Sequence, residues 1–170
     1  NIGDKGAITL SKSKYLRRLK RLILPNNNIS DEGITAIANC ENFKQLTDLD
    51  IYGNVISDDG VKAIAESPYM SNLKKLSLYG NLVEDEGAIA IAESQTLSKL
   101  KHLFINSNRI RREGIESLQK AKCRTRLCHL HVDDLKDFYY EEVADDDDED
   151  LIHTWEELKA RAAKNKDAED

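Results

Sequence analysis

The sequence predicts an α/β solenoid, in which strand-and-helix units stack along one axis with a curved parallel sheet on the concave side and helices on the convex side. Two observations predict this fold. Leucine, glycine and asparagine each recur with a period of 27 residues, and within each period the apolar residues change from alternate positions to the spacing i, i+3, i+4. The periodic residues are Leu19, Leu46, Leu73, Leu100 and Leu127, then Gly6, Gly33, Gly60, Gly87 and Gly114, and then Asn27, Asn54, Asn81 and Asn108.

Each period begins with a segment that is typical of a strand. In the segment 46–51, Leu49 and Ile51 alternate with Asp48 and Asp50, and the segment 73–78 repeats this spacing. Alternation with a period of two marks a half-buried strand. We therefore expect the leucine and isoleucine to face the core and the two aspartates to face outward.

The periodic asparagine follows three positions after the last apolar residue of each strand. At this point the chain turns away from the sheet and leaves backbone groups without ladder partners. An amide side chain can donate and accept hydrogen bonds at once, so it can satisfy such groups in its own and in a neighbouring coil. We expect the four asparagines to form a stacked ladder.

Each period ends with a helix that starts near the periodic glycine. Ser30 and Ser57 are predicted N-caps, and the acidic residues that follow them complement the helix dipole. The glycine permits either a close backbone approach or an unusual dihedral angle. The expected buried stripes, at spacing i, i+3, i+4, are Ile34, Ile37 and Ala38, then Val61, Ile64 and Ala65, and then Ala88, Ile91 and Ala92.

The pattern Leu-x-x-Leu-x-Leu-x-x-Asn-x-Ile-x-Asp-Glu-Gly, followed by Ala-Ile-Ala, resembles the ribonuclease-inhibitor class of leucine-rich repeats. The resemblance covers residues 1–132 and implies a leucine-rich-repeat solenoid that binds another protein. Two departures are the uniform 27-residue step, slightly shorter than is usual in that class, and Arg111 and Arg112, which replace the acidic pair. Relatives of this class include inhibitors, immune sensors, GTPase regulators and bacterial effectors, so the resemblance does not identify the partner.

Composition excludes several classes of protein. The 170 residues carry a net charge of −6, of which residues 133–170 contribute −11 and residues 1–132 contribute +5. No apolar run approaches the ~18 residues of a membrane span. Three cysteines without framework spacing favour a reducing, cytoplasmic compartment, or the host cytoplasm for a secreted effector.

The two ends of the chain differ from the repeats. Residues 1–6 align with 28–33, so the first repeat is partial and the chain is expected to be a fragment of a longer protein. After the repeats of 1–132 we predict a C-terminal cap at 133–144, an acidic linker at 145–153, and a short helix with its tail at 154–170. That helix either folds back onto the cap or presents a linear motif.

The outward strand positions define candidate binding residues in three columns across the sheet. Exposed aromatic rings often anchor interfaces, which favours binding over the alternative that the rings only pack on one another. The predicted partner-binding residues are Arg21, Asp48, Lys75, His102 and His129 in the first column, Asp50, Phe104 and His131 in the second, and Tyr52 and Tyr79 in the third. Ile23 and Ser77 complete the second column, and Pro25, Asn106 and Asp133 complete the third.

No motif for catalysis or for a cofactor is present. One cluster, formed by Cys123, Cys128 and three histidines, has the chemistry of metal ligands, but its spacing matches no zinc motif, so we expect no metal. The chain has no catalytic triad, phosphate-binding glycine loop or paired carboxylates, which indicates that it is not an enzyme. Mixed charges on the sheet and the acidic tail argue against nucleic acid.

The sequence therefore predicts a protein-interaction module, monomeric and without a cofactor, that binds another protein on the concave face of the sheet. A host-directed bacterial effector is one form of this function. Two alternatives stay open. The chain could be the targeting or regulatory fragment of a larger enzyme, such as a ubiquitin ligase or GTPase regulator, or it could be a structural repeat that associates with itself.

Overall fold

The computed structural model describes residues 1–124, 127 and 129–132; the predicted cap, acidic linker and C-terminal helix lie outside them. Strands and helices alternate along the described chain. The strands are β1 (Arg21–Ile23), β2 (Asp48–Asp50), β3 (Lys75–Ser77), β4 (His102–Phe104) and β5 (His129–His131). The α-helices are α1 (Gly3–Ser11), α2 (Asp31–Ala38), α3 (Asp58–Glu66), α4 (Asp85–Glu93) and α5 (Arg112–Arg124), with short 3-10 helices η1 (Glu41–Phe43) and η2 (Pro68–Met70).

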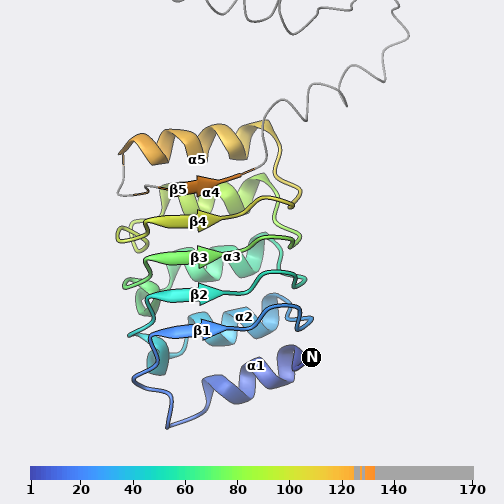
Figure 1. Cartoon of the computed structure of the whole chain (residues 1–170), viewed down its shortest axis with the longest axis vertical. Helices are drawn as coiled ribbons and strands as arrows, with labels where there is room; N and C mark the ends of the chain where they lie inside the picture. Colours follow the sequence, from blue (N-terminus) through green and yellow to red (C-terminus); the bar gives the residue numbers. More distant parts are fainter. Residues whose placement is uncertain (125–126, 128, 133–170) are drawn as a thin grey trace, which may run out of the picture. The chain divides into compact units, whose positions relative to one another are not determined.

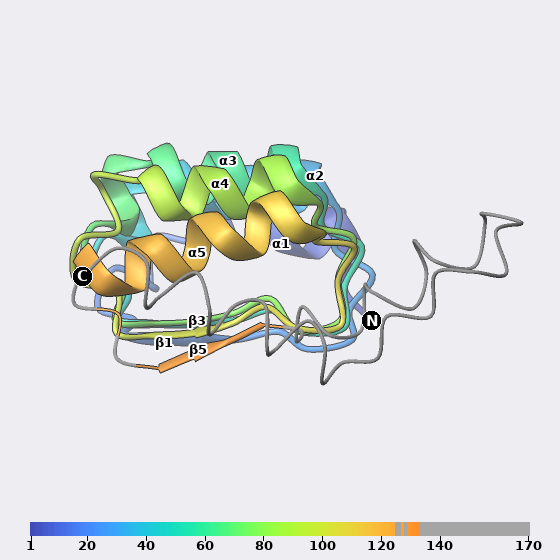
Figure 2. The same cartoon turned by 90° about the horizontal axis from the view of Figure 1, so that it is seen from above.

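The five strands form one open parallel sheet in the order β1-β2-β3-β4-β5 (Figure 1). The helices cover one side of this sheet, and no described helix covers the other side (Figure 2). We call that second side the sheet face. Among the described residues, no helix is long and apolar enough to span a membrane.

The core lies between the sheet and the helices. Leu49 and Ile51 of the third repeat are fully buried, as the alternation predicted, and Leu76 and Leu78 repeat them in the fourth. The predicted helix stripes are also buried, except Ala92, which is half-buried. Because each repeat buries its apolar residues against its neighbours, the stack itself creates the core.

The asparagine ladder is confirmed. Asn54 donates from Nδ2 to the carbonyl oxygens of Ile51 at 2.8 Å and Leu24 at 3.0 Å, and its Oδ1 accepts from the amides of Ile29 at 2.9 Å and Asn27 at 3.1 Å. One side chain thus satisfies backbone groups in two repeats. Asn81 and Asn108 repeat this pattern in the next two repeats.

A second ladder, made by aspartates, was not predicted. The carboxylate of Asp31 accepts three hydrogen bonds from the start of the next helix: from Ser57 N at 2.8 Å, Ser57 Oγ at 2.6 Å and Gly60 N at 3.0 Å. Asp4 binds the second repeat in the same way. Asp85 accepts from Arg111 and Gly114. Each helix start is therefore held by the repeat before it.

This ladder corrects the predicted role of Ser57. Ser30 caps its helix by accepting from the amide of Glu32, but the Ser57 side chain makes no cap bond. The hydroxyls of both serines donate to the aspartate of the preceding repeat, that of Ser30 to Asp4 at 2.8 Å and that of Ser57 to Asp31 at 2.6 Å. Because a charged acceptor forms a strong hydrogen bond, this contact is the one that the two serines share.

The periodic glycines serve a close approach, the first of the two predicted alternatives. Gly60 has no left-handed dihedral angle, but a Cβ atom there would lie 2.5 Å from Oδ1 of Asp31 and 2.6 Å from Cγ2 of Ile34. Gly33, Gly87 and Gly114 meet the preceding aspartates Asp4, Asp58 and Asp85 in the same way. The aspartate and the apolar side chains beside it thus leave no room for a side chain at this position.

Candidate binding face

The strand register places the predicted residues in columns on the sheet face. Parallel pairing aligns Arg21 with Asp48, Asp48 with Lys75, Lys75 with His102 and His102 with His129, as predicted for the first column. Neighbouring residues in a column lie about 5 Å apart, the distance between paired strands. The first column therefore alternates cation, anion and cation before it ends in two imidazoles.

The second column is more apolar than the first. Its register is Ile23, Asp50, Ser77, Phe104 and His131. Ser77 was expected to face solvent, but only 8% of its surface is exposed. A serine is short beside its larger column neighbours, so its outward position does not make it accessible.

Side chains of β3, β4 and β5 contact one another through their rings, both within a column and between the first two columns. The imidazoles of His102 and His129 stack with centroids 4.6 Å apart, and the rings of Phe104 and His131 stack at the same distance. Nζ of Lys75 lies 5.2 Å from the centroid of the Phe104 ring, within the range of a cation–π interaction. These contacts hold the side chains in place before any partner binds.

Tyrosines form the third column at the carboxyl ends of the strands. The rings of Tyr52 and Tyr79 meet edge to face, with centroids 6.4 Å apart and an angle of 66° between their planes. Tyr52 is half-buried, whereas 44% of Tyr79 is exposed. The rings therefore pack on one another, and Tyr79 still presents apolar surface to solvent.

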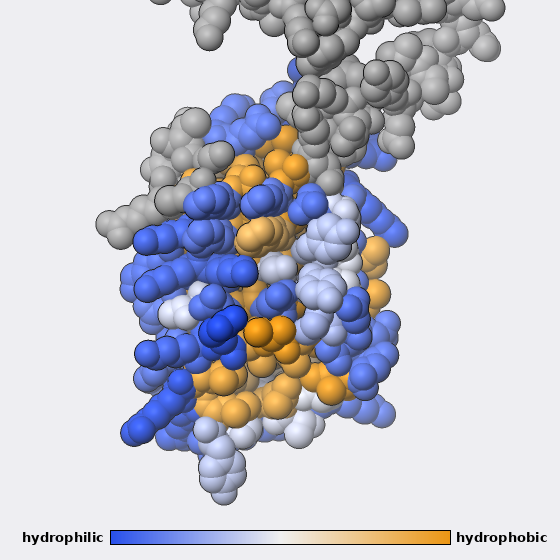
Figure 3. Space-filling model, viewed as in Figure 1, coloured by the Kyte–Doolittle hydropathy of each residue, from blue (hydrophilic) through white to orange (hydrophobic). Residues whose placement is uncertain are grey.

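Ile23 is an apolar residue of this face that was not among the predicted binding residues. It lies on β1 and is 53% exposed, more than Tyr79. The sequence signal was present, because Ile23 occupies an outward strand position where most other repeats carry polar residues. In Figure 3, apolar side chains gather along the middle of the sheet face and hydrophilic ones lie beside them.

The sheet face offers rings, cations and carboxylates. Asp48 accepts from the hydroxyl of Thr47 at 2.7 Å, and Asp50 accepts from the amide of Tyr52 at 3.4 Å. The arrangement is suited to recognition by shape and charge.

The candidate metal cluster does not assemble within the described residues. His102 and His129 place their ring faces, not their nitrogen edges, against each other, with an interplanar angle of 13°. Cys128 and the side chain of Cys123 lie outside what the structure describes. No group of three or more described His, Cys, Asp or Glu residues could hold a metal ion.

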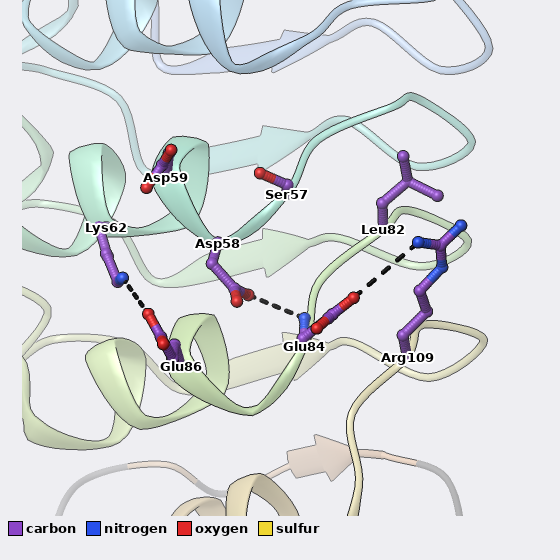
Figure 4. A pocket seen from close by; sticks show the side chains of 8 residues that line it. All are labelled: Ser57, Asp58, Asp59, Lys62, Leu82, Glu84, Glu86 and Arg109. Carbon is purple, nitrogen blue, oxygen red and sulfur yellow. Dashed lines mark hydrogen bonds and ion pairs between the residues drawn. The ribbon is translucent and has the colours of Figure 1, made fainter.

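A hollow of about 340 Å³ lies at the helix starts of the third and fourth repeats, away from every predicted binding residue. Lys62 and Glu86 form an ion pair of 2.5 Å across it, and Asp58 accepts from the amide of Glu84 at 2.8 Å (Figure 4). Arg109 approaches Glu84 within 3.9 Å. Most of the charged side chains that line the hollow are therefore engaged with one another.

The Lys62–Glu86 pair gives a prediction for pH. The hydrogen bond from Lys62, and then its charge, lower the pKa of Glu86 below the ordinary value of 4.5. The pair therefore contributes stability above that value, and the contribution is lost as the pH falls through the lowered pKa. In an NMR titration, Lys62→Met should return the Glu86 pKa toward 4.5. Lys5→Met, a change far from the pair, should leave it lowered; an unchanged Glu86 pKa in Lys62→Met would contradict the assignment.

The comparisons with known proteins agree with this architecture. A profile of the Leucine Rich repeat family matches residues 15–38, 45–65 and 69–92. No curated protein matches the sequence. Forty-seven chains of solved structures match the chain. One is an internalin from Listeria monocytogenes, with a TM-score of 0.53 and 26% identity over 77% of this chain and 34% of that one.

The described part of the chain is thus a leucine-rich-repeat solenoid of the α/β class. Leucine-rich-repeat domains generally mediate protein–protein interaction and are typically not enzymes. The chain spans 34% of the length of the internalin.

Proposed function

We propose that the protein binds another protein on its sheet face, the predicted concave side. The observation that carries this proposal is the exposed apolar surface of Ile23 and Tyr79, 53% and 44% exposed, on a face that no described helix covers. Large apolar and aromatic residues on a rigid surface contribute most of the binding energy in interfaces. The columns around them supply charges that select the partner.

The geometry supports a preorganised surface. The stacked rings of Phe104 and His131, together with Lys75 over Phe104, lose little further freedom when a partner binds. The five paired strands hold all the columns in one register. A partner therefore meets side chains whose relative positions are already set.

A capture experiment with two matched variants tests the proposal. The sheet-face variant is Ile23→Ser/Tyr79→Ala, and the control is Val55→Ser/Tyr15→Ala, which changes the same kinds of exposed residue elsewhere on the surface. Proteins retained from lysate by the wild type are identified by quantitative mass spectrometry, purified and titrated against all three forms. We expect the sheet-face variant to bind the partner at least about tenfold more weakly and the control to match the wild type. Equal affinity of all three would refute the proposal.

A finer form of the proposal is a host-directed bacterial protein that works in the host cytoplasm. It is supported by the likeness to an internalin of the bacterium Listeria monocytogenes and by the predicted resemblance to the ribonuclease-inhibitor class. Capture from host lysate rather than bacterial lysate tests it. A partner found only in the bacterial lysate would contradict it.

Two alternatives give different results. For a targeting fragment of a larger enzyme, the complete reading frame would reveal an enzymatic domain beyond the repeats. A self-associating repeat predicts a mass that rises with concentration in sedimentation equilibrium, and that rise should vanish in the sheet-face variant. A concentration-independent monomer mass favours the binding module.

A further inference from the structure

A strip of cations runs along the side of the sheet where the strands begin. Four of its residues are exposed, and the fifth, Lys75, is half-buried. We call this strip the basic rim; its residues are Lys20, Arg21, Lys74, Lys75 and Lys101. In Figure 3, hydrophilic side chains line the side of the sheet face where the strands of Figure 1 start.

Backbone hydrogen bonds place the rim residues side by side. The carbonyl oxygen of Lys20 accepts from Thr47 N at 2.8 Å, that of Thr47 accepts from Lys74 N at 2.8 Å, and that of Lys74 accepts from Lys101 N at 2.9 Å. Three strand spacings separate Lys20 from Lys101, which is about 14 Å. The rim is therefore a continuous feature of the sheet.

None of the ion pairs within the described residues involves a rim residue. The four ion pairs found there involve Lys44, Lys62, Arg109 and Arg112, none of which belongs to the rim. At the strand starts, among positions 20–21, 47–48, 74–75 and 101–102, one carboxylate occurs, that of Asp48. Like charges held this close repel one another, and an anionic ligand would relieve that repulsion.

We propose that the basic rim binds an acidic, extended segment of the partner protein that covers the sheet face, so the inference rests on the proposed function. Lys75 connects the two surfaces, because it belongs to the rim and its Nζ lies 5.2 Å from the ring of Phe104. An extended chain advances about 3.4 Å per residue, so four or five residues cover the rim. Every second side chain of this segment faces the basic rim.

The surroundings favour a peptide over nucleic acid. Asp48 lies between the rim residues Arg21 and Lys75 in the first column, Asp50 lies in the second column, and the whole chain carries a net charge of −6. A continuous phosphate backbone would approach these carboxylates, whereas a peptide can place its acidic side chains at the cations alone. Phe104 is half-buried beneath Lys75 and packed against His131, so it does not offer a free ring for base stacking.

Fluorescence anisotropy with the full chain tests the proposal. The probe is a dye-labelled octapeptide of alternating glutamate and serine, and the control peptide replaces each glutamate with glutamine. We expect the wild type to bind only the glutamate peptide, with affinity that falls as salt rises. The rim variant Lys20→Glu/Lys74→Glu/Lys101→Glu should weaken binding at least about tenfold. The neutral variant Lys20→Gln/Lys74→Gln/Lys101→Gln should give a smaller loss.

Matched variants separate this result from the proposed function. Lys5→Glu/Arg111→Glu/Lys120→Glu changes the net charge by the same amount at exposed residues away from the rim, and it should keep peptide binding within about twofold of the wild type. Ile23→Ser/Tyr79→Ala should also keep it, even where it abolishes partner binding. No saturable binding by the wild type, or an equal loss in the off-rim variant, would overturn the proposal. So would tighter binding of a thymidine octanucleotide that is lost in the rim variant.

Discussion

Asn81→Ala is expected to lower the free energy of unfolding by about 3 kcal/mol, because it removes a buried side chain that serves two repeats at once. Asn81 is 6% exposed. Its amide donates to Ile51 O at 3.1 Å and Leu78 O at 3.0 Å, and it accepts from Ile56 N at 3.1 Å. Alanine would leave these backbone groups buried without their partner.

Urea unfolding followed by circular dichroism measures this loss. Asn39→Ala is the matched control, because Asn39 is exposed and its side chain makes no described hydrogen bond. The control should change stability by no more than about 0.5 kcal/mol. A loss of less than about 1 kcal/mol in Asn81→Ala would show that water or backbone movement replaces the ladder, and would contradict its structural role.

The periodicity of the sequence was sufficient to predict the columns and the asparagine ladder. Both depend on backbone register, and a constant 27-residue step places equivalent residues on neighbouring strands, as the pairing of Leu49 with Leu76 shows. The glycine step indicated either a close approach or an unusual dihedral angle, and the structure shows the close approach. The approach of the aspartate carboxylate to the glycine was not predicted, although the aspartates recur with the same 27-residue step, at Asp4, Asp31, Asp58 and Asp85. Their carboxylates had been assigned to the dipole of their own helix.

The candidate site was less predictable than the fold because it depends on how side chains cover one another. Ser77 occupies an outward position and is buried, whereas Ile23 occupies an equivalent position and is 53% exposed. Strand alternation predicts the direction of a side chain but not the size or rotamer of its neighbours. The stacking of Phe104 on His131 is a contact of this second kind.

The aspartate ladder predicts that Asp31 and Gly60 are energetically coupled. A Cβ at residue 60 would lie 2.5 Å from Oδ1 of Asp31 and 2.8 Å from Cγ2 of Ile56. Gly60→Ala should therefore cost about 3 kcal/mol, the upper range for overpacking a buried site. Asp31→Ala should cost about 2 kcal/mol, because Ser57 N and Gly60 N lose their acceptor.

A double-mutant cycle in urea measures the coupling. In Asp31→Ala/Gly60→Ala the carboxylate is absent, so the new methyl group at residue 60 has one close contact fewer. The double variant should therefore lose at least about 1 kcal/mol less free energy of unfolding than the two single variants lose in total. Glu32→Ala, in the same turn of α2 but exposed, is the control and should add to Gly60→Ala without coupling. Strict additivity of Asp31 and Gly60 would mean that the apolar neighbours alone exclude a side chain at residue 60. Coupling would instead establish that the glycine is required by a hydrogen bond from the preceding repeat, which makes each helix start depend on its neighbour.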